Sequence, residues 1–186
     1  MGTTQTTEPQ RGLTFDDVWA ALKETDRLIK ELREEGKENA RKMGYLSNRF
    51  GELAEHLVGP SIMEKFNELG FNFTERSRDK EIKEPNSTET LAEIDILLEN
   101  GDIVIAVEVK SKPKEADIEK HVKRMEILRN AGNRRGDKRK YRGAVAGAIM
   151  SQAIRDYIIQ SGFYLIEQSG DTVKITIPEG FSPRNW

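Results

Sequence analysis

An Asn-Gly pair between two apolar runs is the feature of this sequence that most constrains its fold. Residues 93–110 resemble two strands that flank Glu99-Asn100-Gly101-Asp102. Asn-Gly is the strongest short signal for a two-residue β-hairpin turn. With Asn100 and Gly101 as the loop, Glu99 pairs with Asp102. Because every second residue of a strand faces the same side, the sequence predicts a hairpin with one wholly apolar face.

The opposite face of this hairpin gathers acids and a lysine, namely Glu93, Asp95, Glu108 and Lys110. The predicted register places Asp95 opposite Ala106 and diagonal to Glu108, with about 7–8 Å between their Cα atoms. Like charges on neighbouring strands repel each other, so this arrangement costs stability unless something binds there. A divalent cation would relieve the repulsion, and Lys110 could stabilise the charge of a phosphate beside it. The alternative is a surface hairpin with a salt-bridged polar face.

Composition narrows the kind of site to one built from oxygen ligands. The chain has no cysteine and only two histidines, which excludes thiolate zinc sites, iron–sulfur clusters, cysteine nucleophiles and histidine-rich metal sites. Carboxylates favour magnesium or manganese. The formal net charge is −2, so nucleic acid could be attracted only by a local basic patch.

The length of 186 residues fits one domain with a proper core. Residues 1–12 are expected to be a disordered tail, because they are polar and lack the apolar core of a signal peptide. No apolar run approaches the roughly 20 residues of a membrane helix. We therefore expect no membrane association and a cytoplasmic location.

Residues 13–45 carry an apolar stripe with heptad-like spacing between charged positions, interrupted near Gly36 and Asn39. This pattern predicts a long helix. Two interpretations stay open. The helix packs on its own domain, or it pairs with a second copy of the chain in a dimer or higher homo-oligomer.

Residues 46–186 are expected to form an α/β domain with a mixed sheet, since helical and strand patterns alternate along them. Gly59-Pro60 is expected to stop the long helix and Ser61 to cap the next one, which Gly70 ends. Residues 76–90 are expected to be a charged loop. The further expected strands are 71–75, 144–150, 163–167 and 172–177, and the further expected helices are 114–130 and 152–160.

The placement of Asp95 on one strand and Glu108-Val109-Lys110 on the next resembles the PD-(D/E)XK nuclease superfamily. The expected order of helix, three strands, helix and strand is similar to that superfamily's core. The resemblance implies a restriction-endonuclease-like core (αβββαβ, a mixed sheet flanked by helices), preceded here by a long N-terminal helix. It also implies that Asp95, Glu108 and the backbone carbonyl of Val109 hold Mg²⁺ or Mn²⁺, and that Asp95, Glu108 and Lys110 are catalytic.

Two stretches, 48–55 (NRFGELAE) and 143–147 (GAVAG), are similar to a group of uncharacterised prokaryotic members of the superfamily. In that group a coiled-coil-like helix precedes the nuclease domain. The superfamily often adds a glutamate from the preceding helix, four residues after a glycine. Glu55 lies four residues after Gly51, so Glu55 is expected as the third metal ligand and a catalytic residue. Glu52 stays open as the alternative.

Residues 129–142 form the one concentrated basic segment of the sequence, and two interpretations of it stay open, a nucleic-acid contact and a merely solvated loop. The residues expected to contact phosphates are Arg134, Arg135, Lys138, Arg139 and Lys140. His121, on the helix after the Glu-X-Lys strand, is expected at the surface or half-buried.

These features predict a magnesium-dependent nuclease that hydrolyses phosphodiester bonds, with DNA as the expected substrate of an endonuclease. One alternative is a weakly active or inactive nuclease fold that binds nucleic acid or assembles into oligomers. Another is a small-molecule phosphodiesterase, for which the basic segment would be unnecessary.

Overall fold

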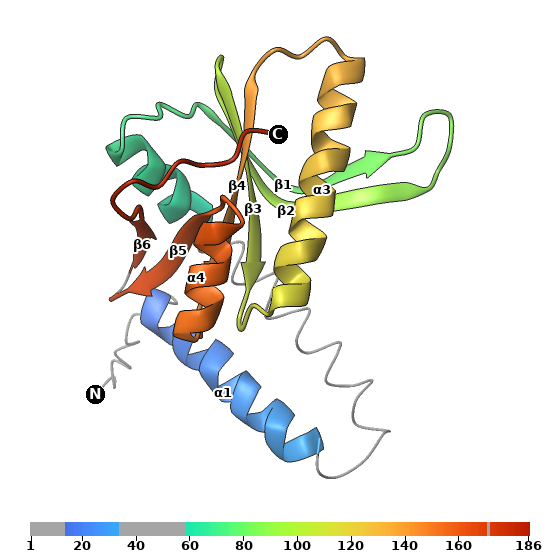
Figure 1. Cartoon of the computed structure of the whole chain (residues 1–186). Coiled ribbons are helices and arrows are strands. Elements are labelled where there is room, and N and C mark those ends of the chain that lie inside the picture. The colour runs from blue at the N-terminus through green and yellow to red at the C-terminus, as the bar shows by residue number, and fades with distance from the viewer. Residues whose placement is uncertain (1–13, 34–58, 171) are drawn as a thin grey trace, which may run out of the picture.

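The computed structural model describes residues 14–33, 59–170 and 172–186, and its centre is a six-stranded mixed sheet (Figure 1). The strands lie side by side in chain order. The first three, β1 (Glu75–Lys83), β2 (Thr90–Glu99) and β3 (Ile103–Lys110), form an antiparallel meander. β4 (Lys140–Gly147) is parallel to β3 and β5 (Tyr164–Ser169) is parallel to β4, whereas β6 (Thr172–Thr176) returns antiparallel.

Helices cover both faces of the sheet. α3 (Glu115–Arg134) and α4 (Gln152–Gln160) connect the parallel strands β3, β4 and β5. Because both are crossover connections of the same handedness, they pack on one face. α1 (Phe15–Arg33) and the helix at residues 59–68 pack on the other. The expected α/β class, with a mixed sheet flanked by helices and an N-terminal helix, is confirmed.

The two faces of the predicted hairpin separate as the alternation of its residues indicates. Apolar residues such as Ile96 and Val107 pack toward α1 and the helix at 59–68. Leu97 and Ala106 pack toward α3 and α4. Ile94 is the exception, because it packs on the α3 side beyond the point where β2 and β3 stop pairing.

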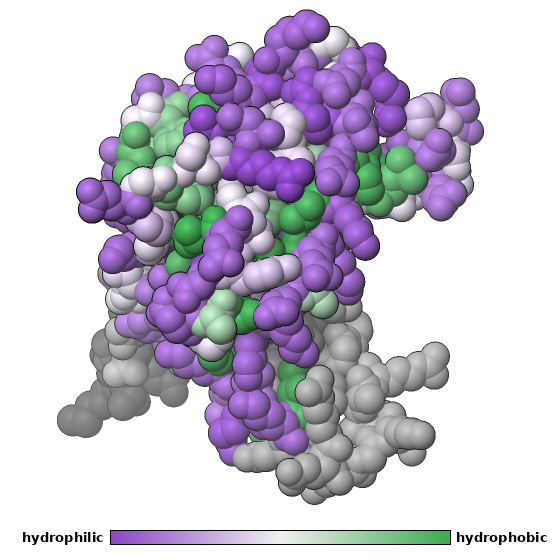
Figure 2. Space-filling view, in the orientation of Figure 1, coloured by the Kyte–Doolittle hydropathy of each residue, from purple (hydrophilic) through white to green (hydrophobic). Residues whose placement is uncertain are grey.

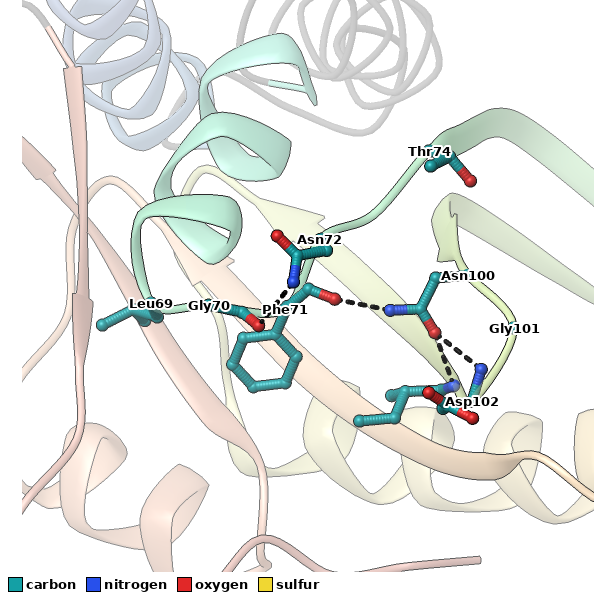
Figure 3. Close-up of a pocket in the computed structure, with 9 residues that line it drawn as sticks. Leu69, Gly70, Phe71, Asn72, Thr74, Asn100, Gly101 and Asp102 are labelled. Atoms are coloured by element: carbon teal, nitrogen blue, oxygen red, sulfur yellow. Dashed lines mark hydrogen bonds between the residues drawn. The ribbon is translucent and has the colours of Figure 1, made fainter.

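The hairpin turn lies one residue further along the chain than predicted, at Gly101-Asp102. The closing contact is the Asn100 N–H donating to the Ile103 carbonyl at 3.1 Å, and Glu99 pairs with Val104 instead of Asp102. Figure 3 shows the reason: the Asn100 side chain forms hydrogen bonds with the backbone of the turn and with Phe71. Its Oδ1 accepts the Asp102 and Ile103 N–H groups at 2.8 Å each, and its Nδ2 donates to the Phe71 carbonyl at 2.5 Å.

β1 is a strand where the sequence predicts a charged loop over 76–90. Of its nine residues only Ile82 is buried, so the side chains carry no strand signal. The backbone groups of β1 pair with β2, and charged side chains suit an exposed edge strand. Residues 71–74, predicted as part of a strand, instead form the connection into β1.

Other boundaries differ from the expectation by a few residues. The described helix at 59–68 already includes Gly59 and Pro60, so Ser61 lies within a helix rather than capping its start. α3 extends to Arg134 and β4 begins at Lys140, so the basic segment over 129–142 is a loop only between these two elements.

The first half of α1 packs into the core of its own chain. Val18, Trp19 and Leu22 are buried among residues of the sheet and of the helix at 59–68. Leu22 is therefore covered without a second copy of the chain. Further along the helix, Leu28 is 42% exposed. Ile29, which belongs to the predicted stripe, is half-buried. The stripe residues from Leu32 onward and the predicted tail lie outside the described side chains.

No helix within the described ranges is long and apolar enough to cross a membrane.

Candidate functional site

Asp95 and Glu108 meet where the pairing between β2 and β3 ends, on the face of the sheet that α3 covers. The last pair of this ladder is Ile96 with Val107. The next step of the same register places Asp95 directly across from Glu108. The predicted register had them offset by two residues, diagonal to each other. Both acids are buried, with 9% of Asp95 and 2% of Glu108 exposed.

The Asp95 carboxylate takes over a backbone hydrogen bond at this point. The Val109 N–H donates to Asp95 Oδ2 at 2.8 Å, whereas continued pairing would direct it toward β2 backbone. A carboxylate between two strands thus replaces a ladder bond, which explains why the ladder ends here. Both contacts that the described residues make with Asp95 use Oδ2, so Oδ1 is available to a ligand.

Lys110 joins the two acids from the end of β3. Its Nζ lies 2.8 Å from Glu108 Oε1 and 3.7 Å from Asp95 Oδ2. It also donates to the Val109 carbonyl at 3.3 Å. The structure therefore brings together four of the predicted site residues, including the carbonyl expected as a metal ligand.

Two residues of α3, Arg124 and His121, complete the surroundings of Glu108, and the sequence did not single out Arg124. Arg124 Nη1 donates to Glu108 Oε2. His121 is fully buried rather than exposed or half-buried, with Nδ1 3.8 Å from the same oxygen. The i, i+3 spacing of the two residues places them on one side of a helix. The spacing in the sequence could show that the two residues share a side of the helix. It could not show that this side lies over Glu108, because that depends on how α3 crosses the sheet.

Burial and neighbouring charges shift the pKa values of Asp95 and Glu108 in opposite directions. Burial, together with the charge of Glu108, raises the pKa of Asp95 to about 6. Burial alone would raise the pKa of Glu108 too, but Lys110 and its other neighbours hold that pKa below its ordinary value. Burial would lower the pKa of Lys110, but Glu108 and Asp95 raise it, so the lysine stays protonated. Glu108 is thus ionised at neutral pH, whereas Asp95 takes up a proton only slightly below neutral pH.

The donor set suits a hard divalent cation. Two adjacent carboxylates and a nearby backbone carbonyl are the ligands that Mg²⁺ and Mn²⁺ prefer. Within the described ranges, no group of three or more histidine, cysteine or carboxylate side chains could hold a metal ion. Glu55 and Glu52, the predicted third ligands, lie outside the described residues.

The predicted phosphate-binding residues lie at the other end of the sheet. Lys140 pairs with Ile103 at the start of β3, whereas Lys110 at its end pairs with Gly147. The seven residue steps from Ile103 to Lys110 span roughly 23 Å at about 3.3 Å per step. Arg134, Arg135, Lys138 and Arg139 belong to the same region, from the end of α3 to the start of β4. The fold therefore does not bring the basic segment to the acid–lysine cluster.

Part of the basic segment is engaged in structural contacts. Arg139 donates to Asp137 Oδ2 at 2.7 Å and lies 3.1 Å from Glu99 Oε1. Arg134 and Arg135 line a groove of about 570 Å³ together with Lys80. Figure 2 shows hydrophobic residues reaching the surface in this region, where the β1–β2 hairpin emerges beside α3. Arg139 lines the same groove but is already paired with carboxylates.

Comparison with known protein families, curated proteins and solved structures finds no match to the chain. A function is therefore inferred from the geometry of the cluster.

Proposed function

We propose that the protein is a metal-dependent nuclease that hydrolyses phosphodiester bonds, with DNA as the substrate. The observation that carries the proposal is the buried pair of Asp95 and Glu108 with Lys110 2.8 Å from Glu108. Two buried carboxylates side by side repel each other, so they cost stability that nearby cations only offset, and a functional role accounts for their presence. A raised pKa beside a lowered one is characteristic of functional sites.

Each residue of the cluster has a distinct role in this proposal. Asp95 and Glu108 hold Mg²⁺ or Mn²⁺, together with the Val109 carbonyl and a glutamate from residues 46–58, either Glu55 or Glu52. A cation in this position supplies Lewis-acid activation of water and neutralises charge on the phosphate. The Lys110 ammonium, which stays protonated, stabilises the charge that develops on the phosphate oxygens.

The observed element order supports membership of the PD-(D/E)XK superfamily. A helix at 59–68 precedes three antiparallel strands, α3 and β4, which is the order expected of a restriction-endonuclease-like core. The acids lie on the second and third strands and the lysine two residues after Glu108, as the resemblance requires. The element order extends over the domain and not over a short motif alone.

The second candidate is a nuclease fold that binds nucleic acid without cutting it. It is favoured by one observation: both Glu108 oxygens contact cationic side chains, Lys110 and Arg124, so the cluster is complete without metal. Metal-dependent cleavage separates the two candidates.

The test is cleavage of supercoiled plasmid DNA with Mg²⁺ or Mn²⁺ by the wild type and by Asp95→Asn and Glu108→Gln. Both substitutions keep an oxygen acceptor, so melting temperatures should stay within a few degrees of wild type while cleavage falls at least 100-fold. The matched control is Glu93→Gln. It removes one exposed acid from the same strand and should leave cleavage unchanged. Equal cleavage by all four proteins would show that a contaminating nuclease or another site is responsible.

A further inference from the structure

The described side chains around Glu108 balance their charges without a metal. Asp95 and Glu108 are opposed by Lys110 and Arg124, and each Glu108 oxygen has one cationic partner. His121 adds no charge near neutral pH, because burial lowers its pKa to about 4. The free protein therefore already holds its own counter-ions where a divalent cation would bind.

Arg124 is the one described donor to Glu108 Oε2. His121 Nε2 lies 3.2 Å from the Ala106 carbonyl. Since a carbonyl only accepts, Nε2 carries the proton and Nδ1 of the neutral ring does not. Among the described residues Nδ1 accordingly has no hydrogen-bond partner, although it is 3.8 Å from Oε2. His121 therefore packs beside Glu108 without neutralising it. Among the described side chains, Arg124 is the one that neutralises Glu108 Oε2.

Arg124 is positioned to leave this contact. Its side chain is 29% exposed, whereas that of Glu108 is 3% exposed, so the guanidinium reaches from solvent to a buried acid. Lys110 is more firmly held, since it contacts Glu108, Asp95 and the Val109 carbonyl. The planar guanidinium also suits a phosphate, which it can bind through two parallel hydrogen bonds.

A divalent cation beside Asp95 and Glu108 changes this balance to an excess of two positive charges. The excess falls when Arg124 turns away, and a phosphodiester that arrives with the cation reduces it by one more charge. The cluster therefore favours joint binding of cation and phosphate over binding of the cation alone.

We propose that Arg124 is an internal counter-ion that occupies Glu108 in the free protein and transfers to the substrate phosphate when cation and nucleic acid bind together. This inference rests on the proposed nuclease function and assigns Arg124 two successive partners. It predicts weak affinity for Mn²⁺ in the free protein and a strong increase in that affinity when a phosphodiester is present.

Calorimetric titration with Mn²⁺ tests the proposal without any turnover. The titrations compare wild type with Arg124→Gln, at constant ionic strength, with and without a phosphorothioate duplex that resists cleavage. Without the duplex, Arg124→Gln should bind Mn²⁺ about tenfold more tightly, because one repelling charge a few ångströms away is gone. With the duplex, wild type should gain affinity for Mn²⁺, and Arg124→Gln should gain about tenfold less.

Two further variants make the comparison specific. Lys123→Gln removes the same charge from an exposed neighbouring position of α3 and should match wild type. Arg124→Met keeps the apolar stem of the side chain and should behave as Arg124→Gln, which covers the case in which the glutamine variant does not fold.

The outcomes are distinct. Equal or weaker Mn²⁺ affinity in both Arg124 variants would overturn the counter-ion role while leaving the metal site intact. An absence of Mn²⁺ binding in wild type and variants, with or without duplex, would overturn the metal site and with it this inference.

Discussion

Burial decides the protonation state of His121, a single residue at the wall of the site. The ring is fully buried, lies 4.8 Å from the Phe163 ring and directs Nε2 to the Ala106 carbonyl. Burial lowers its pKa to about 4, even though the charge of Glu108 raises it. In the unfolded chain the pKa is near 6.5. The unfolded state thus takes up a proton first, and stability is lost as pH falls from about 6.5 toward 4.

We expect His121→Gln to reduce this acid sensitivity, because glutamine can keep a donor toward Ala106 without titrating. Between pH 7 and pH 5 the free energy of unfolding of wild type should fall by about 2 kcal/mol more than that of the variant. Asp95, whose pKa is raised to about 6, acts in the opposite direction but is present in both proteins. Urea unfolding at the two pH values measures the difference, and parallel pH profiles would contradict the assignment of a buried neutral histidine.

At the scale of elements, the β2–β3 hairpin depends on the side chain of Asn100 and not on the conformational freedom of Gly101. Gly101 has no positive φ, and a Cβ added to it would meet nothing within 4 Å. The three hydrogen bonds of the Asn100 side chain hold the turn closed and tie it to Phe71. The register that places Asp95 across from Glu108 therefore begins at this turn.

Gly101→Ala should change the free energy of unfolding by less than about 0.5 kcal/mol, as a surface substitution without strain does. Asn100→Ala should cost about 2 kcal/mol, since it removes three hydrogen bonds, one of them to a half-buried carbonyl. Chemical unfolding of both variants measures the two effects. The Asn-Gly register expected from sequence gives the opposite result for Gly101, because a type I′ turn needs a positive φ there.

At the scale of the whole molecule, the sheet separates two cores, and α1 belongs to one of them. Val18, Trp19 and Leu22 contribute to the core that also contains the helix at 59–68. α1 also reaches the site end of the sheet, where Lys112, two residues after Lys110, lies 3.7 Å from Asp26. The N-terminal helix is thus part of the domain over its first turns, and oligomerisation through the rest of residues 13–45 stays a prediction.

Leu22→Ala should lower the free energy of unfolding by about 2–5 kcal/mol, as the loss of a buried leucine side chain does. Leu28→Ala, on the same helix but 42% exposed, should cost less than about 1 kcal/mol. Chemical unfolding at two protein concentrations twentyfold apart measures both. A cost for Leu22→Ala that depends on protein concentration would mean that a second copy covers this residue.

The distance between the cluster and the basic segment predicts that substrate length matters. Phosphates contacted near Arg134 and Arg135 lie roughly 23 Å from the site, or about seven base pairs at ~3.4 Å each. The double variant Arg134→Ala/Arg135→Ala should therefore weaken binding of duplexes with long flanks and lower the salt slope by about one per lost contact. Duplexes with flanks shorter than about five base pairs should bind the double variant as tightly as they bind the wild type.

Fluorescence anisotropy with the two duplex lengths, at several salt concentrations, checks this prediction. Lys174→Ala, an exposed lysine of β6, serves as the control for lost charge. Unchanged binding of the long duplex by the double variant would leave the basic segment as a solvated surface.

The sequence by itself determined those helices and strands whose apolar residues recur at a regular spacing. Alternation over β2 and β3 is a property of a strand with two different faces, so residue spacing alone placed Asp95, Glu108 and Lys110 on one side of the hairpin. The same reasoning identified α3 and α4, whose apolar residues recur at helical spacing. The pattern failed for β1, because an edge strand with a single buried residue is held by backbone pairing, and backbone groups are the same in every sequence.

Tertiary structure decided everything that depends on how elements cross. A hydrogen bond from Asn100 to Phe71, 29 residues away, accompanies the register that sets Asp95 opposite Glu108. The crossing of α3 brought Arg124 to Glu108 and buried His121, while the parallel pairing of β3 with β4 sent Lys140 to the far end of the sheet. Local spacing fixes which side of an element a residue faces. Only the packing of one element on another decides which residue it meets.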